Sequence, residues 1–208
     1  MFERSNTLES RRAEQSKITA NWIMRMRDCL SDVDQQQFFL DALHTVGISG
    51  RDLDERRNIE QHQLDQTLQL ILRRVPDISL RMFSRAEISD LGVMGYAAIN
   101  SGSVGRALKF LNDYHELTSD RYVDSITVDD EFARVTPLPR MAHIQDFKNI
   151  AEDSLAGNWR MLGLLMGDSL DATKAGAYFD FPPPSYEQTY YDVFTCPVHF
   201  NAERNELV

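Results

Sequence analysis

The stretch from Ser89 to Asp120 constrains the fold of this chain most, because small residues, apolar periodicity and capping signals agree there. Residues 91–99 are almost all apolar or small, and Gly92 and Gly95 stand three positions apart among them. A glycine inside a helix costs about 1 kcal/mol relative to alanine, so its presence there indicates the close approach of another backbone. We therefore predict a buried helix over residues 91–99.

A second helix is predicted directly after it, over residues 103–116. Ser103 is a suitable N-cap, because its hydroxyl can accept a hydrogen bond from the first turn. Apolar residues then recur at positions i, i+3, i+4 and i+7, namely Val104, Ala107, Leu108 and Leu111. This spacing predicts an amphipathic helix that packs its apolar face against the rest of the domain.

The remainder of the chain changes from helical to alternating periodicity. Residues 1–14 are polar and lack an apolar stripe, so we expect a flexible arm there, followed by a single domain over residues 15–208. Beyond the helix pair, the pattern predicts the following elements: a β-hairpin over residues 122–135 closed by Pro137 and Pro139, a helix over 141–166, a strand over 173–181, a helix over 186–194, and short strands around Val198 and Leu207. This order predicts an α+β fold, with a helical layer packed on a small antiparallel sheet.

Composition narrows the classes of protein to which the chain can belong. Its 208 residues carry a net charge of −10, which argues against this segment binding nucleic-acid phosphates. The sequence contains no apolar run of the ~20 residues needed to span a bilayer and no signal-peptide core, so we expect a cytoplasmic protein without a membrane partner. The two cysteines, Cys29 and Cys196, suggest neither a disulfide framework nor a metal cluster.

Catalytic and cofactor-binding motifs are missing from the sequence. It contains no P-loop, dinucleotide-binding glycine run, GxSxG, HExxH, EF-hand loop or CxxC pair. Its five histidines fall in separate segments, without the helical spacing of a metal face. We therefore expect no catalytic residues, no metal site and no cofactor. His115 deserves the first inspection, because it ends the second helix beside Tyr114, although a terminal cation also suits the helix dipole.

Two segments carry a resemblance to a known family. The run LGVMGYAAINSGSVGRALKFLNDYHEL, residues 91–117, and the run FDFPPPSYEQTYYDVFTCPVHFNAERNELV, residues 179–208, resemble the N-terminal regulatory domain, often labelled arabinose-binding, of AraC-type transcriptional regulators. The resemblance implies that Ile78 to Met82 are helical, where periodicity alone leaves strand and helix open. It also implies a C-terminal pair of helix-turn-helix units that bind DNA, which we expect to be absent from this chain.

The resemblance implies a regulatory module rather than an enzyme. Such a module binds a small-molecule effector, pairs with a second copy and biases the attached DNA-binding domain. Two alternatives stay open at the level of sequence: a dimerisation module without a ligand, and a haem or gas sensor or an enzyme that uses His115. The sequence identifies neither the effector nor the controlled genes.

We predict the effector pocket between the central helices and the strand that ends at Phe181. Aromatic bulk beside a few polar groups is typical of small-molecule sites. The candidate lining residues are Met94, Tyr96, Asn100, His115, Trp159, Phe179 and Phe181. A fully packed core is the competing interpretation of the same residues.

Overall fold

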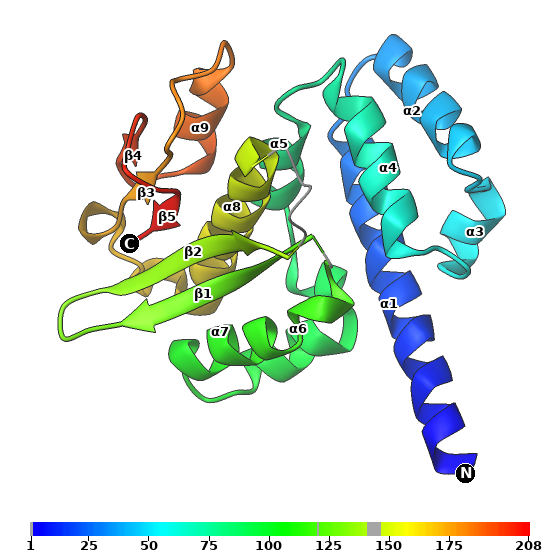
Figure 1. The fold of residues 1–208 in the computed structure, drawn as a ribbon, viewed down its shortest axis with the longest axis horizontal. Coiled ribbons are helices and arrows are strands. Elements are labelled where there is room, and N and C mark those ends of the chain that lie inside the picture. Colours follow the sequence, from blue (N-terminus) through cyan, green and yellow to red (C-terminus); the bar gives the residue numbers. More distant parts are fainter. Residues whose placement is uncertain (1, 120, 141–146) are drawn as a thin grey trace.

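The structure is a computed structural model, and it describes residues 2–119, 121–140 and 147–208. It is mostly helical with one small sheet (Figure 1), which confirms the predicted α+β class. The chain begins with α1 (Phe2–Asp28), α2 (Val33–Thr45), α3 (Gly50–Glu55), α4 (Gln61–Leu72) and α5 (Ile78–Ser84). Helix α5 settles the ambiguity at Ile78 to Met82 in favour of a helix.

Helix α1 is the long element against which α4, α5 and α6 pack (Figure 1). It extends back to Phe2, so the described part of the segment expected to be an arm is helical. Polar contacts replace the missing apolar stripe in this segment. Arg11 pairs with Glu116 at 3.1 Å, and the Glu14 carboxylate accepts a hydrogen bond from the backbone N–H of Val93 at 2.9 Å.

The predicted helix pair is present as α6 (Gly92–Ile99) and α7 (Val104–Asp113), flanked by 3-10 turns η1 (Ile88–Leu91) and η2 (His115–Leu117). Ser103 caps α7 as predicted, since its hydroxyl accepts from the backbone N–H of Arg106 at 3.3 Å. Gly95 allows the expected close approach: a Cβ there would lie 2.0 Å from the carbonyl oxygen of Ile88. Helix α6 is buried on one face only, because Tyr96 on its other face is exposed.

The sheet begins with the predicted hairpin, formed by β1 (Tyr122–Val128) and β2 (Ala133–Pro139). Strands β3 (Ala177–Tyr178), β4 (Val198–His199) and β5 (Glu206–Leu207) complete the order β1-β2-β5-β3-β4 within the described residues. The sheet is mixed rather than purely antiparallel, because β3 pairs with β4 in the parallel direction.

Two strand predictions differ in extent from the structure. The strand expected over residues 173–181 is reduced to β3, because Ala172–Lys174 form the 3-10 turn η4, which the Asp171 carboxylate caps at the N–H of Thr173. Pro137 and Pro139 lie inside β2 rather than closing the hairpin. Within the described residues, β5 pairs with β2 only at Val135. No second strand there needs the N–H groups that the two prolines lack.

Helix α8 (Phe147–Met166) packs against α5 and β2, and it continues into the 3-10 turn η3 (Gly167–Ser169). The predicted helix over 141–166 is confirmed from Phe147 onward, and its first six positions lie outside the described residues. Helix α9 (Glu187–Val193) matches the predicted helix over 186–194.

The core forms two clusters that meet at α5. The first lies among α1, α2, α4 and α5 and includes Ile23, Phe39 and Ile71. The second joins α8 to α9 and the sheet and includes Leu155. Phe83 of α5 packs against both clusters. The candidate site lies at this junction, where Phe83 lines it.

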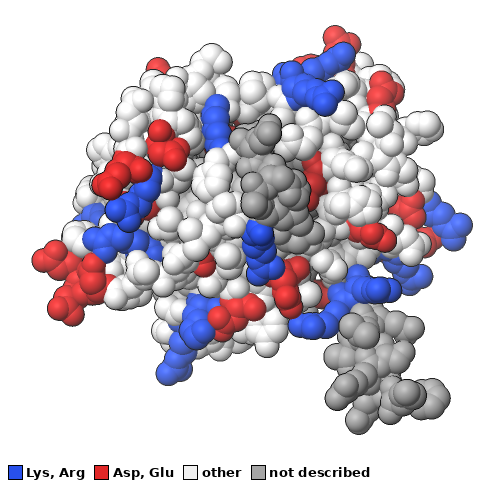
Figure 2. All heavy atoms as spheres, in the orientation of Figure 1, with Lys and Arg blue, Asp and Glu red and all other residues white. Residues whose placement is uncertain are grey.

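Two surface properties bear on partners. Among the helices of the described residues, none is long and apolar enough to cross a lipid bilayer. On the face shown in Figure 2, Lys and Arg side chains are interspersed with Asp and Glu side chains and do not gather in one basic patch. This face therefore lacks the clustered positive charge that binding to nucleic-acid phosphates requires.

Candidate functional site

A cavity of about 110 Å³ lies where the helical cluster meets the hairpin and α8. Its lining side chains come from α1, α4, α5, α6, α7, β1 and α8, with further residues from the segment around η2. An apolar cavity of roughly 150 Å³ is known to accept benzene. The cavity is therefore of the right order for a small organic molecule.

One wall of the cavity is apolar. It is formed by Trp22, Leu64, Leu68, Met82, Phe83, Leu91, Met94, Leu108, Leu111 and Met161. The rings of Trp22 and Phe83 lie against each other, with 4.8 Å between their centroids. Methionine and leucine dominate the rest of this wall, and flexible thioether side chains adapt well to the shape of a ligand.

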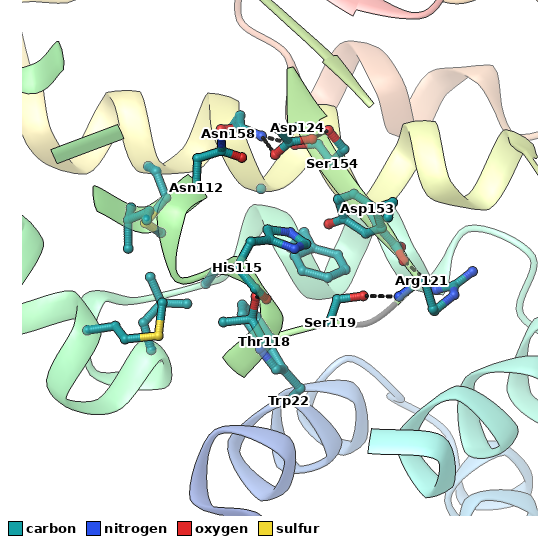
Figure 3. A pocket seen from close by; sticks show the side chains of 18 of the residues that line it. Trp22, Asn112, His115, Thr118, Ser119, Arg121, Asp124, Asp153, Ser154 and Asn158 are labelled. Atoms are coloured by element: carbon teal, nitrogen blue, oxygen red, sulfur yellow. Dashed lines mark hydrogen bonds and ion pairs between the residues drawn. The ribbon is translucent and has the colours of Figure 1, made fainter. Parts of the chain in front are cut away.

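The opposite wall carries a buried carboxylate. Asp124 projects from β1 and is only 7% exposed. One of its oxygens accepts a hydrogen bond from the hydroxyl of Ser154 at 2.6 Å, and the other accepts from the side-chain amide of Asn158 at 2.7 Å. Both donors come from α8, so these bonds tie the hairpin to that helix. Figure 3 shows this group at one end of the view, together with Asn112, and Trp22 at the other end.

His115 lies between these two ends (Figure 3). Its ring packs on Tyr122 with 4.7 Å between centroids. Within the described residues, its buried Nδ1 has no hydrogen-bond partner, and the same is true of the side-chain carbonyl oxygen of Asn112. Burial lowers the pKa of His115, and the opposing effect of Asp124 does not restore it. The imidazole is therefore neutral at neutral pH, and the cavity presents buried polar atoms that a ligand could satisfy.

Arg121, at the start of the hairpin, is the cationic residue among the described residues that line the cavity. Its guanidinium donates to Asp153 of α8 at 2.8 Å and lies 3.7 Å from Asp65 of α4. Burial alone would lower the pKa of Arg121, but the two carboxylates outweigh it and raise that pKa. Arg121 is thus a structural cation that joins α4, the hairpin and α8.

The residues predicted to line the pocket fall in three places. Met94 and His115 line the cavity. Tyr96 and Asn100 are exposed, and the Asn100 side chain donates to the backbone carbonyl of Tyr96 at 2.7 Å. They face away from the cavity because the buried face of α6 is formed by Met94, Gly95 and Ala98.

Of the three remaining residues, Trp159 and Phe179 belong to the second core cluster, and the partly buried Phe181 packs against it. Phe179 is fully buried and packs its ring 4.9 Å from that of Tyr190. These aromatic side chains fill the space beside β3, so the cavity lies against β1 and not against the strand that ends at Phe181. This cavity therefore lies beside β1, whereas the pocket was predicted beside the strand that ends at Phe181.

Sequence reasoning missed Trp22, Asn112, Asp124 and Asn158 as lining residues. A signal was present for one of them. Tyr122, Asp124 and Ile126 share one face of an alternating strand, and an acidic residue between two apolar ones on the buried face of a strand indicates a special environment. The other three residues carry no such local signal.

Groups of His, Cys, Asp and Glu side chains that could hold a metal ion are absent from the part of the chain that the structure describes. The cavity instead combines a pliable apolar wall with a few fixed polar groups. This combination is typical of a small-molecule binding domain.

Comparison with known proteins agrees with this class. The family described as the arabinose-binding domain of AraC transcription regulator, N-terminal, matches residues 39–208. The chain belongs to this family of transcription-regulator domains. The resemblance carried by residues 91–117 and 179–208 is thereby confirmed.

A curated relative is the ornithine utilization regulator of Pseudomonas aeruginosa. It is 26% identical to this chain over 125 residues, which are 60% of this chain and 36% of that protein. The match thus spans about a third of the relative's length.

Proposed function

We propose that this chain is the effector-sensing part of a transcriptional regulator, and that the cavity between Trp22 and Asp124 is its effector site. The observation that carries the proposal is the composition of the cavity wall: an apolar face lies opposite two buried polar atoms that lack a hydrogen-bond partner within the described residues, Nδ1 of His115 and the side-chain carbonyl oxygen of Asn112. Unsatisfied buried polar groups cost free energy, and a bound molecule removes that cost.

The position of the cavity suggests how binding could be transmitted. A ligand there would contact α1, α7, the hairpin and α8 at once. It can shift the arrangement of these elements only to the extent that it binds one arrangement more tightly than another. A shift caused by the ligand would reach the C-terminal strands through the hairpin and α8, because β2 pairs with β5 at Val135 and Leu207.

The direct test is a thermal-shift and calorimetric screen against a metabolite panel. Binding raises the apparent stability by RT ln(1 + [L]/Kd). The name of the Pseudomonas aeruginosa relative makes ornithine the first compound to include. A Leu111→Trp variant, which fills the cavity, should lose the response, whereas Leu138→Trp on the exposed part of β2 should keep it. A stable Leu111→Trp protein that binds the hit unchanged would place the effector elsewhere.

We also propose that the domain acts as a homodimer, since closed two-fold pairs are the commonest soluble oligomers. The exposed face of α6 supports this proposal, because Val93, Tyr96 and Ile99 are 61%, 59% and 48% exposed. Sedimentation velocity at micromolar concentration should show a dimer. Tyr96→Glu should convert it to a monomer without unfolding it, because the side chain is exposed, whereas a Tyr191→Glu control on the exposed face of α9 should remain dimeric.

In this proposal, DNA is bound by a helix-turn-helix domain that follows this segment in the complete regulator. The regulator would act in the cytoplasm. Two observations support a separate DNA-binding domain: the net charge of this segment is −10, and its match covers 36% of the relative's length. A gel-shift assay should show operator binding by the full regulator and none by this segment alone.

The competing functions make different demands on the cavity. A dimerisation module without a ligand would show no thermal shift with any compound. A haem sensor that uses His115 would need space for a porphyrin, which is several times larger than benzene, and a cavity of about 110 Å³ does not provide it. An absorbance spectrum of the purified protein tests the haem alternative directly.

A further inference from the structure

Within the described part of the chain, the carboxylate of Asp124 is buried beside the cavity without a cationic partner. It is 7% exposed, and within the described residues it accepts two hydrogen bonds, both from neutral groups, the hydroxyl of Ser154 and the amide of Asn158. Among the described residues, no Lys or Arg forms an ion pair with it. Removing an ionised carboxylate from water is expensive unless a positive charge compensates it.

The other charged groups of the cavity do not supply that compensation. Among the described residues that line the cavity, three carboxylates, those of Asp65, Asp124 and Asp153, lie with one guanidinium, that of Arg121, which leaves a surplus of two negative charges. Arg121 is already engaged by Asp153 at 2.8 Å and by Asp65 at 3.7 Å.

His115 does not supply the missing charge either. Burial lowers its pKa, so the imidazole is neutral at neutral pH although it lies close to Asp124. Polar atoms near Asp124 that lack a hydrogen-bond partner within the described residues also favour a ligand that donates hydrogen bonds. The buried Asn112 oxygen is an acceptor, and a neutral imidazole offers one nitrogen as an acceptor and the other as a donor. The polar end of the cavity is therefore rich in acceptors and has an unpaired negative charge.

We propose that the ligand of this cavity is a small organic cation, a primary ammonium compound with a short apolar body, whose charged nitrogen binds Asp124 and the Asn112 oxygen. The apolar body would lie on Met94, Leu111 and Trp22. A primary ammonium group has three donors and no acceptor, which matches a carboxylate and an amide carbonyl. This inference rests on the proposed function, because it names the ligand class of the same cavity.

A trio of four-carbon probes tests it: n-butylamine as its ammonium ion, n-butanol and butanoate. These molecules share an apolar body and differ in charge, and each is small enough for a cavity of about 110 Å³. Isothermal titration of the wild-type protein should show butylammonium binding at least about tenfold more tightly than butanol, with no binding of butanoate. Butanol or butanoate binding as tightly as butylammonium would overturn the inference but keep the cavity as a ligand site.

Two variants locate the charge that matters. Asp124→Asn keeps the shape and can still exchange hydrogen bonds with Ser154 and Asn158, so it should fold while its affinity for butylammonium falls to that for butanol. Asp113→Asn removes an exposed carboxylate on the outer side of α7, paired with Lys109, and should leave the affinity unchanged. Unchanged binding of butylammonium to folded Asp124→Asn would refute the assignment. If none of the three probes bound at millimolar concentration, the cation inference would fail, whereas the proposed function would be decided separately by the metabolite screen and the Leu111→Trp variant.

Discussion

The guanidinium of Arg121 donates a hydrogen bond to the carboxylate of Asp153 at 2.8 Å, and this contact joins the start of the hairpin to α8 beside the cavity. Arg121 is 8% exposed and Asp153 is 2% exposed, so the pair is shielded from water. Breaking a buried ion pair is costly, because removal of one member leaves the charge of the other without its opposite charge.

We expect Arg121→Met to lower the free energy of unfolding by about 3–5 kcal/mol, because it removes the positive charge beside a buried carboxylate. The double variant Arg121→Met with Asp153→Leu should recover most of that loss, since neither charge of this pair remains and the side chain of Asp65 is 32% exposed to water. Urea unfolding followed by circular dichroism measures both values. Equal losses in the single and double variants would contradict this account of the pair.

Gly95 is required by the close passage of η1. A Cβ at this position would meet the carbonyl oxygen of Ile88 at 2.0 Å, and a backbone atom cannot rotate away. Gly95→Ala should therefore lower the free energy of unfolding by about 1–3 kcal/mol through overpacking. Gly105→Ala is the matched control in α7, where nothing lies within 4 Å, and it should stabilise the protein by about 0.5–1 kcal/mol.

Thermal melting of both glycine variants checks this prediction. A Gly95→Ala protein that melts at the wild-type temperature would show that η1 moves aside at little cost. The same result would remove our explanation for glycine in the middle of a helix.

Trp22 should report ligand binding, because it lines the cavity and its ring packs on Phe83 at 4.8 Å. Trp159, at 5% exposure, belongs to the second core cluster and does not line the cavity. We expect the fluorescence change on titration with butylammonium or a screened effector to disappear in Trp22→Phe and to persist in Trp159→Phe. The reverse outcome would restore the original prediction that Trp159 lies at the site.

Glu152 should make stability depend on pH. This α8 residue is fully buried, and its carboxylate accepts hydrogen bonds from the hydroxyls of Tyr186, at 2.9 Å, and Tyr190. Burial raises its pKa from 4.5 to about 7, against the opposing effects of Tyr190 and Lys148. The folded state therefore holds this proton more tightly than the unfolded state does.

Because the folded state binds this proton more tightly, the free energy of unfolding decreases as pH rises. The contribution of Glu152 to stability is fully present below a pH of 4.5, declines as pH rises, and is lost as pH passes the folded pKa of about 7. The difference corresponds to about 3 kcal/mol. Glu152→Gln resembles the protonated acid, so it should flatten this part of the profile and be more stable than wild type above neutral pH. Urea unfolding across this pH range measures the effect, and Glu187→Gln, at an exposed position of α9, should leave the profile unchanged.

Much of the fold could be predicted because its signals are local. The cap at Ser103, the apolar spacing of α7 and the glycine at position 95 each act within one or two turns, and the predicted pair of helices is confirmed. The alternation after Tyr122 likewise predicted the hairpin, because period two is a property of neighbouring residues. The family could also be recognised from such segments, and its match covers residues 39–208.

Other features depended on partners that lie far away in the chain. The helical start of α1 is accompanied by contacts of Arg11 with Glu116 and of Glu14 with Val93, which no local pattern reveals. The parallel pairing of β3 with β4 depends on how the chain returns after α9.

The sequence by itself determined the α+β class, the helix pair, the hairpin and the family, because periodicity, capping and turn chemistry act between near neighbours. Only the tertiary structure decided the site. Trp22, Asp124 and Asn158 come from three distant segments, and they line one cavity because the helical cluster and the sheet cluster meet at Phe83. A cavity is the space that packed side chains leave unfilled, so its position depends on all the elements around it and on no single stretch of sequence.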